Sequence, residues 1–328
     1  MEHIKLNGID KEASRIGLGT WAIGGWMWGG TQERESIDTI LKALDKGINL
    51  IDTAPVYGFG TSEKIVGKAL KEYGKRDEVV LVTKAGLDWK DEKPFRNSSK
   101  ARLQKEIDDS LQRLQTDYID VYMIHWPDAM VDFSETAAVM ESLKKEGKIK
   151  SIAVSNYSPN QMDKFRKGGQ LDVCEPPYNL FERGIEADVL PYCKENDIKT
   201  LVYGAICRGL LSGKMTSKRN FEGDDLRKVD PKFQGDRFAM YLSAVAKLNQ
   251  FARDNYGKRV IHLAVRWLLD NGADIALWGA RNSGQLAVID DMMGWSLDAN
   301  AMKEIENIID KEVTDPVGPE FMAPPASK

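Results

Sequence analysis

The chain alternates short apolar runs with longer amphipathic stretches. The apolar runs predict eight strands, within residues 14–20, 48–53, 79–85, 119–126, 149–156, 171–178, 198–205 and 273–280. The stretches between them repeat apolar residues at helical spacing and predict helices within 31–47, 61–74, 99–115, 134–148 and 186–198. Repeated strand-then-helix units over this length favour a closed (β/α)8 TIM barrel, an α/β fold, over an open sheet.

Two segments fall outside this alternation. Near the start, Asn7-Gly8 lies between two short alternating segments and predicts a β-hairpin that precedes the barrel. Between the seventh and eighth strands lies the long segment 206–273, whose polar part, 213–233, predicts a loop over the barrel mouth followed by two helices. Because no linker or low-complexity tract divides the sequence, we expect residues 1–328 to form a single barrel domain.

Composition and charge narrow the possible functions. The 46 Lys and Arg residues are scattered among 50 Asp and Glu residues, which argues against a nucleic-acid partner. No apolar run approaches the roughly 20 residues of a membrane helix, and the first residues lack a signal-peptide pattern, so we expect a cytoplasmic protein. The three cysteines form no CxxC pair and the three histidines have no zinc-site spacing, so we expect unpaired thiols and no metal.

Polar residues close the predicted strands. In a TIM barrel the carboxyl ends of the strands form the active face, where a polar residue is a candidate for chemistry. Taken singly, each has an ordinary structural explanation, such as a turn cap for Asp52 or a core position for His125. Together they predict a proton-handling site. The strand-end residues are Asp52, Lys84, His125, Ser155, Asn156, Glu175, Tyr203 and Gly279 to Arg281, and Tyr57 follows shortly after Asp52.

The motifs "DTAPVYG", "VTKAG", "IHWPD" and "VSNYS", set in this barrel pattern, resemble the aldo-keto reductase family from about Ser14 onward. The segments "GTWAIGGWMWGG", "YGAICRGLLSGKM" and "DPVGPEFMAPP" resemble a bacterial branch that includes general stress proteins. The resemblance implies an NADP(H)-dependent oxidoreductase that reduces aldehydes or ketones to alcohols. It also allows the reverse reaction with sugar-like or polyol-like substrates.

The resemblance also implies residue roles. Tyr57 would donate the proton, with Asp52, Lys84 and His125 completing a catalytic tetrad. Ser155 and Asn156 would bind the nicotinamide carboxamide and Tyr203 would stack on the ring, while Arg281 and Gln285 would meet the adenosine phosphate. The full set of implied cofactor contacts is Thr20, Trp21, Asp52, Ser155, Asn156, Glu175, Tyr203, Gly204, Ala205, Ile206, Cys207, Arg208, Lys214, Arg227, Gly279, Ala280, Arg281 and Gln285.

Elementary electrostatics gives the tetrad a rationale. A free tyrosine, with a pKa of about 10, is a reluctant acid, and a nearby ammonium stabilises its ionised form. We therefore expect Lys84 to lower the pKa of Tyr57 toward neutrality and Asp52 to hold Lys84 charged and in place. A neutral His125 can donate one hydrogen bond to the substrate oxygen.

Charge also bears on the cofactor. Arg281, Lys214 and Arg227 supply cations that suit a 2′-phosphate, so we predict a preference for NADP(H) over NAD(H). One position departs from the family pattern, because relatives usually carry glutamine where this chain has Glu175. Our hypothesis is that the Glu175 carboxylate favours the oxidised, positively charged nicotinamide ring.

Aromatic residues suggest the substrate pocket. Aromatic walls suit aldehydes and ketones with an apolar part, and equally sugar-like or short polyol-derived carbonyls, so both classes stay open. Loop packing alone explains Trp26 and Trp28 equally well. The candidate substrate residues are Trp21, Trp26, Trp28, Phe59 and Trp126.

Two rival interpretations remain to be weighed. "GLGTWA" fits a dinucleotide-binding fingerprint, but the residues that follow do not open an amphipathic helix, so we reject a Rossmann dehydrogenase. The other rival is a nicotinamide-binding regulatory subunit with little turnover, which would need a docking extension or patch that the sequence does not reveal. The sequence leaves the oligomeric state open.

Overall fold

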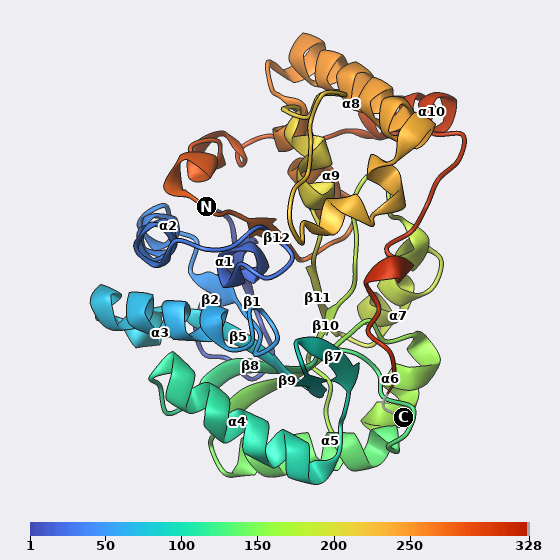
Figure 1. Cartoon of the computed structure of the whole chain (residues 1–328). Helices are drawn as coiled ribbons and strands as arrows, with labels where there is room; N and C mark the ends of the chain where they lie inside the picture. The colour runs from blue at the N-terminus through green and yellow to red at the C-terminus, as the bar shows by residue number, and fades with distance from the viewer. Residues whose placement is uncertain (327–328) are drawn as a thin grey trace.

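The computed structural model describes residues 1–326. Its central strands close into one parallel barrel, in the spatial order β10-β11-β12-β3-β4-β5-β8-β9, which confirms the predicted TIM barrel (Figure 1). The barrel strands are β3 (Ile16–Gly19), β4 (Leu50–Asp52), β5 (Val80–Ala85), β8 (Ile119–Ile124), β9 (Ile149–Ser155), β10 (Val173–Glu175), β11 (Lys199–Val202) and β12 (Ile275–Gly279).

Helices surround the barrel as an outer layer (Figure 1). Local capping explains several of their starts, because Ser99 accepts a hydrogen bond from the Arg102 amide and Asp132 accepts one from the Ser134 amide. The helices are α1 (Trp21–Gly24), α2 (Glu33–Asp45), α3 (Thr61–Tyr73), α4 (Lys100–Leu114), α5 (Phe133–Lys145), α6 (Pro159–Arg166), α7 (Val189–Glu195), α8 (Gly235–Tyr256), α9 (Val260–Asp270) and α10 (Ala299–Glu312).

Helices α6 and α10 were not among the predicted helices. The sequence carries a clear signal for α6, because Ser158 and Gln161 form a capping box around Pro159 at the first helical position. The single turn α1 follows β3 where a dinucleotide fingerprint would require a full helix, and the closed barrel excludes the rejected Rossmann sheet.

The core has two layers, and strand periodicity separates them. Successive side chains of a strand point to opposite faces, so Val80 and Val82 of β5 fill the barrel interior while Leu81 packs outward against the helices. In β8, Val121 and Met123 likewise point inward. The same alternation continues to the carboxyl ends of the strands, where it directs the next inward residues into the barrel mouth.

The N-terminal hairpin closes the opposite end of the barrel. Strand β1 (His3–Lys5) pairs with β2 (Glu12–Ser14), so the hairpin is confirmed, but its strands are not joined by Asn7-Gly8 alone. Leu6 and Ile9 instead turn into the barrel interior and plug it, which lengthens the connection. Gly8 allows this turn, because its φ is +78° and a Cβ there would lie 2.7 Å from the Lys150 carbonyl oxygen.

A second hairpin, not predicted from the sequence, follows β5. It consists of β6 (Leu87–Lys90) and β7 (Lys93–Arg96). Its turn residues Asp91 and Glu92 have φ values of 51° and 58°, a conformation for which Asn or Gly is the usual signal. The chain's last described residues pass beside β7, where the Arg96 amide donates to the Pro325 carbonyl at 3.1 Å.

The long segment between β11 and β12 has the predicted arrangement of an irregular part followed by two helices. Its irregular part contains the short 3₁₀ helices η3 (Cys207–Ser212), η4 (Leu226–Lys228) and η5 (Pro231–Phe233), and the two helices are α8 and α9. Within residues 1–326, none of the helices is both long enough and apolar enough to cross a membrane.

Candidate active site

The inward face of the barrel ends in polar side chains. Asp52 ends β4 two residues after the inward Leu50, and Lys84 lies two residues after the inward Val82. His125 follows Met123 at the same spacing. Ser155, Glu175 and Tyr203 end or follow β9, β10 and β11 with the same parity. Strand alternation therefore brings the predicted residues to one end of the barrel, as the sequence suggested.

Tyr57 reaches this site from the loop after β4. Its ring stacks on Trp21 at 5.9 Å between centroids and meets the His125 ring edge-on at 5.7 Å. The loop is fixed by a close backbone contact, because a Cβ on Gly58 would lie 2.1 Å from the Gly24 carbonyl oxygen. Only glycine fits at this contact, which holds the Tyr57 backbone against the loop after β3.

Lys84 lies beneath Tyr57 and between two carboxyl groups. Its ammonium hydrogen-bonds Asp52, lies 3.5 Å from the Glu175 carboxyl and donates to the Thr53 carbonyl at 3.2 Å. Burial by itself disfavours the ammonium, but the adjacent carboxyl groups, Asp52 above all, outweigh it and raise the pKa of Lys84. Lys84 is therefore held charged, as expected.

The expected acidification of Tyr57 is not found in the cofactor-free protein. Burial raises the pKa of Tyr57 above its ordinary value, and the charge of Lys84 offsets this only in part. The carboxyl groups of Asp52 and Glu175 also raise the pKa of Tyr57, because a carboxylate close to the phenol disfavours the phenolate. Tyr57 lies close to one cation and one acid, as expected, but also close to the second acid Glu175, and its hydroxyl is fully buried.

His125 has the expected neutral form. Burial lowers the pKa of His125 well below its usual value, and the nearby Lys84 charge lowers it further. The imidazole is thus uncharged at neutral pH and has one N–H to donate.

A hydrogen-bond network fixes the opposite wall of the site. Asn156, with a left-handed φ of 63°, donates its side-chain amide to the His125 carbonyl and to Ser155 Oγ. Tyr203 donates its hydroxyl to Asn156 Oδ1 at 2.8 Å, and Ser155 donates to the Glu175 carbonyl at 2.8 Å. These contacts fix the orientation of the side chains in this wall.

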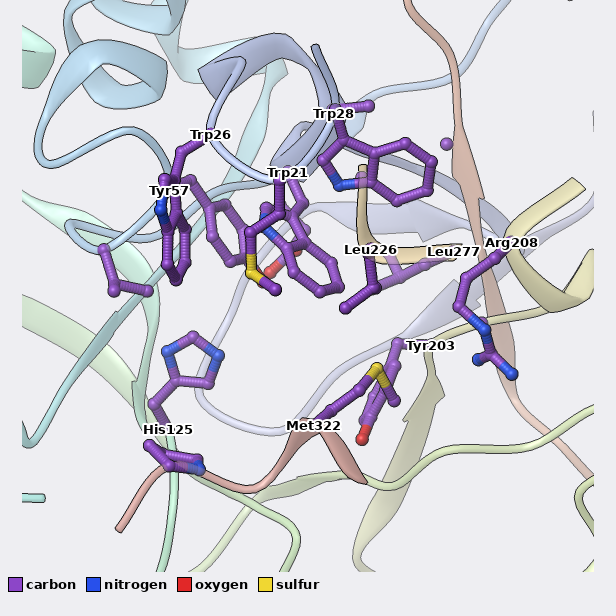
Figure 2. A pocket seen from close by; sticks show the side chains of 18 of the residues that line it. Trp21, Trp26, Trp28, Tyr57, His125, Tyr203, Arg208, Leu226, Leu277 and Met322 are labelled. Carbon is purple, nitrogen blue, oxygen red and sulfur yellow. The ribbon is translucent and has the colours of Figure 1, made fainter. Parts of the chain in front are cut away.

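The site opens into a cavity of about 760 Å³. Figure 2 shows Trp21, Trp26, Trp28 and Tyr57 along one side of it and Tyr203 with Met322 along the other. A cavity of this size, largely apolar with a few converging polar groups, is typical of a small-molecule or cofactor site.

Most predicted site residues line this cavity. They are Trp21, Trp26, Trp28, Asp52, Tyr57, His125, Trp126, Ser155, Asn156, Glu175, Tyr203, Gly204, Ala205, Ile206, Arg208, Arg227, Gly279, Arg281 and Gln285.

Six predicted residues do not line it, and each has a structural reason. Lys84 and Thr20 lie beneath the floor, where Thr20 Oγ1 donates to the Asp52 carbonyl at 2.8 Å. Phe59 packs between Trp26 and Trp89 instead of facing the cavity. Cys207 and Ala280 are buried, and Lys214 is exposed on the polar segment.

The arginines of the cavity differ in how their charges are used. Arg208 binds Glu182 and Asp230 in a buried network, so its charge is already compensated. Arg227 pairs with Asp225 at 2.6 Å. Arg281 instead donates to the carbonyl oxygens of Trp28 and Gly30, at 2.7 and 2.9 Å, and within residues 1–326 no salt bridge involves it. Of the arginines that line the cavity and were predicted to bind the cofactor, Arg281 is therefore the one whose charge no carboxylate among the described residues compensates.

Sequence reasoning missed part of the wall. The unpredicted hairpin supplies Leu87, Glu92, Lys93 and Pro94, and the polar segment supplies Arg219 and Leu226. The C-terminal tail, residues 313–326, supplies Phe321, Met322, Pro324 and Pro325 and runs down from α10 across the barrel mouth (Figure 1). Its "GPEFMAPP" stretch carried a resemblance but did not predict a position, because contacts such as the one from the Arg96 amide to the Pro325 carbonyl join residues far apart in the sequence.

Comparisons with known proteins agree with this geometry. Residues 15–310 match the model of the aldo/keto reductase family. The chain is 60% identical to aldo-keto reductase YhdN of Bacillus subtilis over 99% of its own length and 98% of that protein. It is 38% identical to the NADH-specific methylglyoxal reductase of Escherichia coli, over 82% of this chain and 86% of that one.

A solved structure extends the similarity. The glycerol dehydrogenase AKR11B4 from Gluconobacter oxydans is 50% identical and superposes with a TM-score of 0.89, covering 98% of this chain and 99% of that one. Sequence motifs, barrel topology and the convergence of strand-end residues thus point the same way, and the chain belongs to the aldo/keto reductase family, whose bacterial members it resembles.

Proposed function

We propose that the protein is an NADP(H)-dependent oxidoreductase that interconverts aldehydes or ketones with alcohols, using Tyr57 as the proton donor. The observation that carries the proposal is the convergence of Tyr57, His125 and the Lys84–Asp52 ion pair at one end of a largely apolar cavity. When bound, the nicotinamide cofactor supplies the hydride to the carbonyl carbon, or accepts it in reverse.

The residues present suit such a cofactor. The buried Glu175 Oε2 has no hydrogen-bond partner within residues 1–326, and it belongs to a residue that lines the cavity with Ser155, Asn156 and Tyr203. Polar atoms and an aromatic ring of this kind suit a carboxamide-bearing heterocycle. Toward the far end, Arg281 and Gln285 offer donors to a phosphate.

The proton chemistry follows from the side chains. Carbonyl reduction creates an alkoxide, which is far more basic than a phenolate, so Tyr57 can give up its proton even though burial raises its pKa. The Lys84 ammonium then stabilises the phenolate that remains. Neutral His125 donates one hydrogen bond to the carbonyl oxygen and orients it.

The preference for NADP(H) rests on the cations at the cavity. Arg281 and Arg219 line it, and within residues 1–326 neither forms a salt bridge, so both remain suited to a 2′-phosphate. The E. coli relative is named as NADH-specific, so cofactor choice varies among similar proteins and must be measured for this one.

The proposed substrate class is based on the side chains that line the cavity and on the names of similar proteins. The aromatic lining suits a carbonyl with an apolar or hydroxylated carbon skeleton. Relatives are named glycerol dehydrogenase and methylglyoxal reductase, which favours short oxygenated carbonyls over long aliphatic ones.

The experiment is a panel of short hydroxy-carbonyls, dicarbonyls, aliphatic aldehydes and the corresponding alcohols, each tested with both phosphorylated and unphosphorylated cofactors. Nicotinamide absorbance reports turnover in either direction. Rapid turnover of a short oxygenated carbonyl with NADPH supports the proposal. Cofactor binding without turnover of any carbonyl would favour the regulatory alternative.

A further inference from the structure

The single positive charge of Lys84 lies between two carboxyl groups. Lys84 hydrogen-bonds Asp52 on β4 and lies 3.5 Å from Glu175 on β10. Both carboxyl groups are buried, with side-chain exposures of 3% each. If both were ionised, the buried cluster would carry a net negative charge, which a low-dielectric interior strongly disfavours.

The other groups that face Glu175 supply no compensating charge. Tyr57 and Tyr203 are neutral phenols, and Cys174, its neighbour on β10, is a buried thiol. Burial and the charge of Asp52 raise the pKa of Glu175 well above its usual value, and Lys84 offsets this only in part. Burial raises the pKa of Asp52 too, but Asp52 makes the closer contact with Lys84, which favours the negative charge on Asp52 and the proton on Glu175.

The orientation of Glu175 fits a neutral carboxyl. Its Oε1 faces the Lys84 ammonium as an acceptor. Its Oε2 is buried and has no partner within the described residues, while the residue lines the cavity. A neutral carboxyl has one O–H to donate, and a buried polar atom without a partner among the described residues is suited to hydrogen-bond a ligand.

We propose that Glu175 is protonated in the empty protein and with reduced cofactor, and that it releases its proton to solvent when oxidised cofactor binds in the cavity. The oxidised nicotinamide ring carries one positive charge that the reduced ring lacks. This charge replaces the proton as the partner of the second carboxylate, so the cluster stays neutral in both states. The inference rests on the proposed function only in taking a nicotinamide cofactor to occupy this cavity.

Proton release on binding makes the affinity for the oxidised cofactor depend on pH. If binding of NADP⁺ releases one proton and binding of NADPH releases none, the ratio of their dissociation constants changes about tenfold per pH unit. Higher pH then favours the oxidised cofactor and alcohol oxidation. The 2′-phosphate also titrates, but it is present on both cofactors, so its effect cancels in the ratio.

The experiment is isothermal titration calorimetry of the full chain with NADP⁺ and with NADPH, in two buffers of different ionisation enthalpy. The buffer dependence of the heat gives the number of protons released on binding. Near pH 7.5, we expect NADP⁺ to release about one proton more than NADPH. Equal proton counts for the two cofactors would overturn the proposal, whatever the variants do.

Variants assign the proton to a residue. Glu175→Gln should abolish the difference between the cofactors, and Glu175→Asp, which keeps a titratable carboxyl, should retain it. Glu222→Gln removes an exposed carboxyl that does not line the cavity and should leave the difference unchanged. A difference that persists in Glu175→Gln overturns the proposal, as does one that disappears in Glu222→Gln.

Failure of the proposed function is distinguishable from failure of this inference. If neither cofactor binds, the proposed function is wrong and this inference falls with it. If both bind with the same proton count, only the role of Glu175 is wrong.

Discussion

The ammonium of Lys84 lies 5.2 Å from the centre of the Tyr57 ring. Both groups are buried, and Asp52 holds the ammonium from below. The phenol therefore keeps its proton in the resting protein, while the charge that would stabilise the phenolate is already in position.

Tyr57→Phe should reduce carbonyl turnover about 100- to 10,000-fold, because it removes the proton donor and little else. Cofactor binding, followed by a change in protein or nicotinamide fluorescence, should be retained. Tyr73→Phe is a matched control, since Tyr73 lies on α3 away from the cavity and bonds Glu78. Turnover within a fewfold of wild type in Tyr57→Phe would exclude Tyr57 as the acid.

Arg281→Ala should weaken NADPH binding about 10- to 100-fold and leave NADH binding nearly unchanged. Arg281 lines the cavity without a carboxylate partner among the described residues, so its charge is available to a 2′-phosphate. Dissociation constants for both reduced cofactors measure the effect. Lys218→Ala is the control, because it removes an exposed surface cation. An unchanged ratio of the two constants would contradict the predicted role.

His125 should make the protein less stable as the pH falls. Burial lowers the pKa of His125 in the folded state, so below its unfolded pKa of about 6.5 the unfolded chain binds a proton that the folded protein does not. The free energy of unfolding then falls with pH, by up to about 1.4 kcal/mol per pH unit from this group.

His125→Gln lacks this titration. Between about pH 7 and about pH 5, the free energy of unfolding should therefore fall more for wild type than for His125→Gln. Urea unfolding at a series of pH values measures it. A difference that stays constant with pH would show that His125 is not held neutral.

The buried ion pairs of Glu182 should contribute to the free energy of unfolding. Glu182 binds both Arg208 and Lys232, the latter at 2.8 Å, and Lys232 also donates to the Gly318 carbonyl of the tail. Glu182→Gln leaves two buried cations with one fewer carboxylate and should lower the free energy of unfolding by about 3 to 5 kcal/mol. The exposed Glu222→Gln is the control.

The same network has a predictable pH dependence. Burial opposes ionisation of Glu182, but Arg208 and Lys232 outweigh it and lower its pKa to about 2. Its contribution is therefore present above the unfolded pKa of about 4.3 and is lost as the pH falls toward 2. Wild type should lose more stability than Glu182→Gln over that interval, and a parallel loss in both proteins would refute the assignment.

Arg96 should hold the C-terminal tail over the cavity. Its side chain donates to the Pro324 and Pro127 carbonyls, at 3.0 and 2.9 Å. Arg96→Ala should speed hydrogen exchange of the neighbouring tail amides by on the order of tenfold and raise the KM for substrate, because Phe321 and Met322 line the cavity. Arg253→Ala, exposed on α8, should change neither. Unchanged exchange in Arg96→Ala would show that the tail is held elsewhere.

The barrel and the positions of Asp52, Lys84 and His125 at its mouth could be predicted because their signals are local. Alternation along β4, β5 and β8 directs Asp52, Lys84 and His125 inward, and parallel strands of a closed barrel carry these ends to one face. The hairpin of β6 and β7 was missed because Asp91 and Glu92 occupy turn positions where glycine or asparagine would have been the signal.

The sequence by itself determined the order of strands and helices, the inward parity of the strand-end residues and the chemical types available at the barrel mouth. Only the tertiary structure decided which charges remain available. Arg208 was an implied cofactor contact, but Glu182 and Asp230 compensate its charge. Lys84 lies beside two carboxyl groups, where the sequence argument expected only Asp52. The reason is physical: periodicity acts between near neighbours, whereas burial and charge compensation depend on residues brought together from distant parts of the chain.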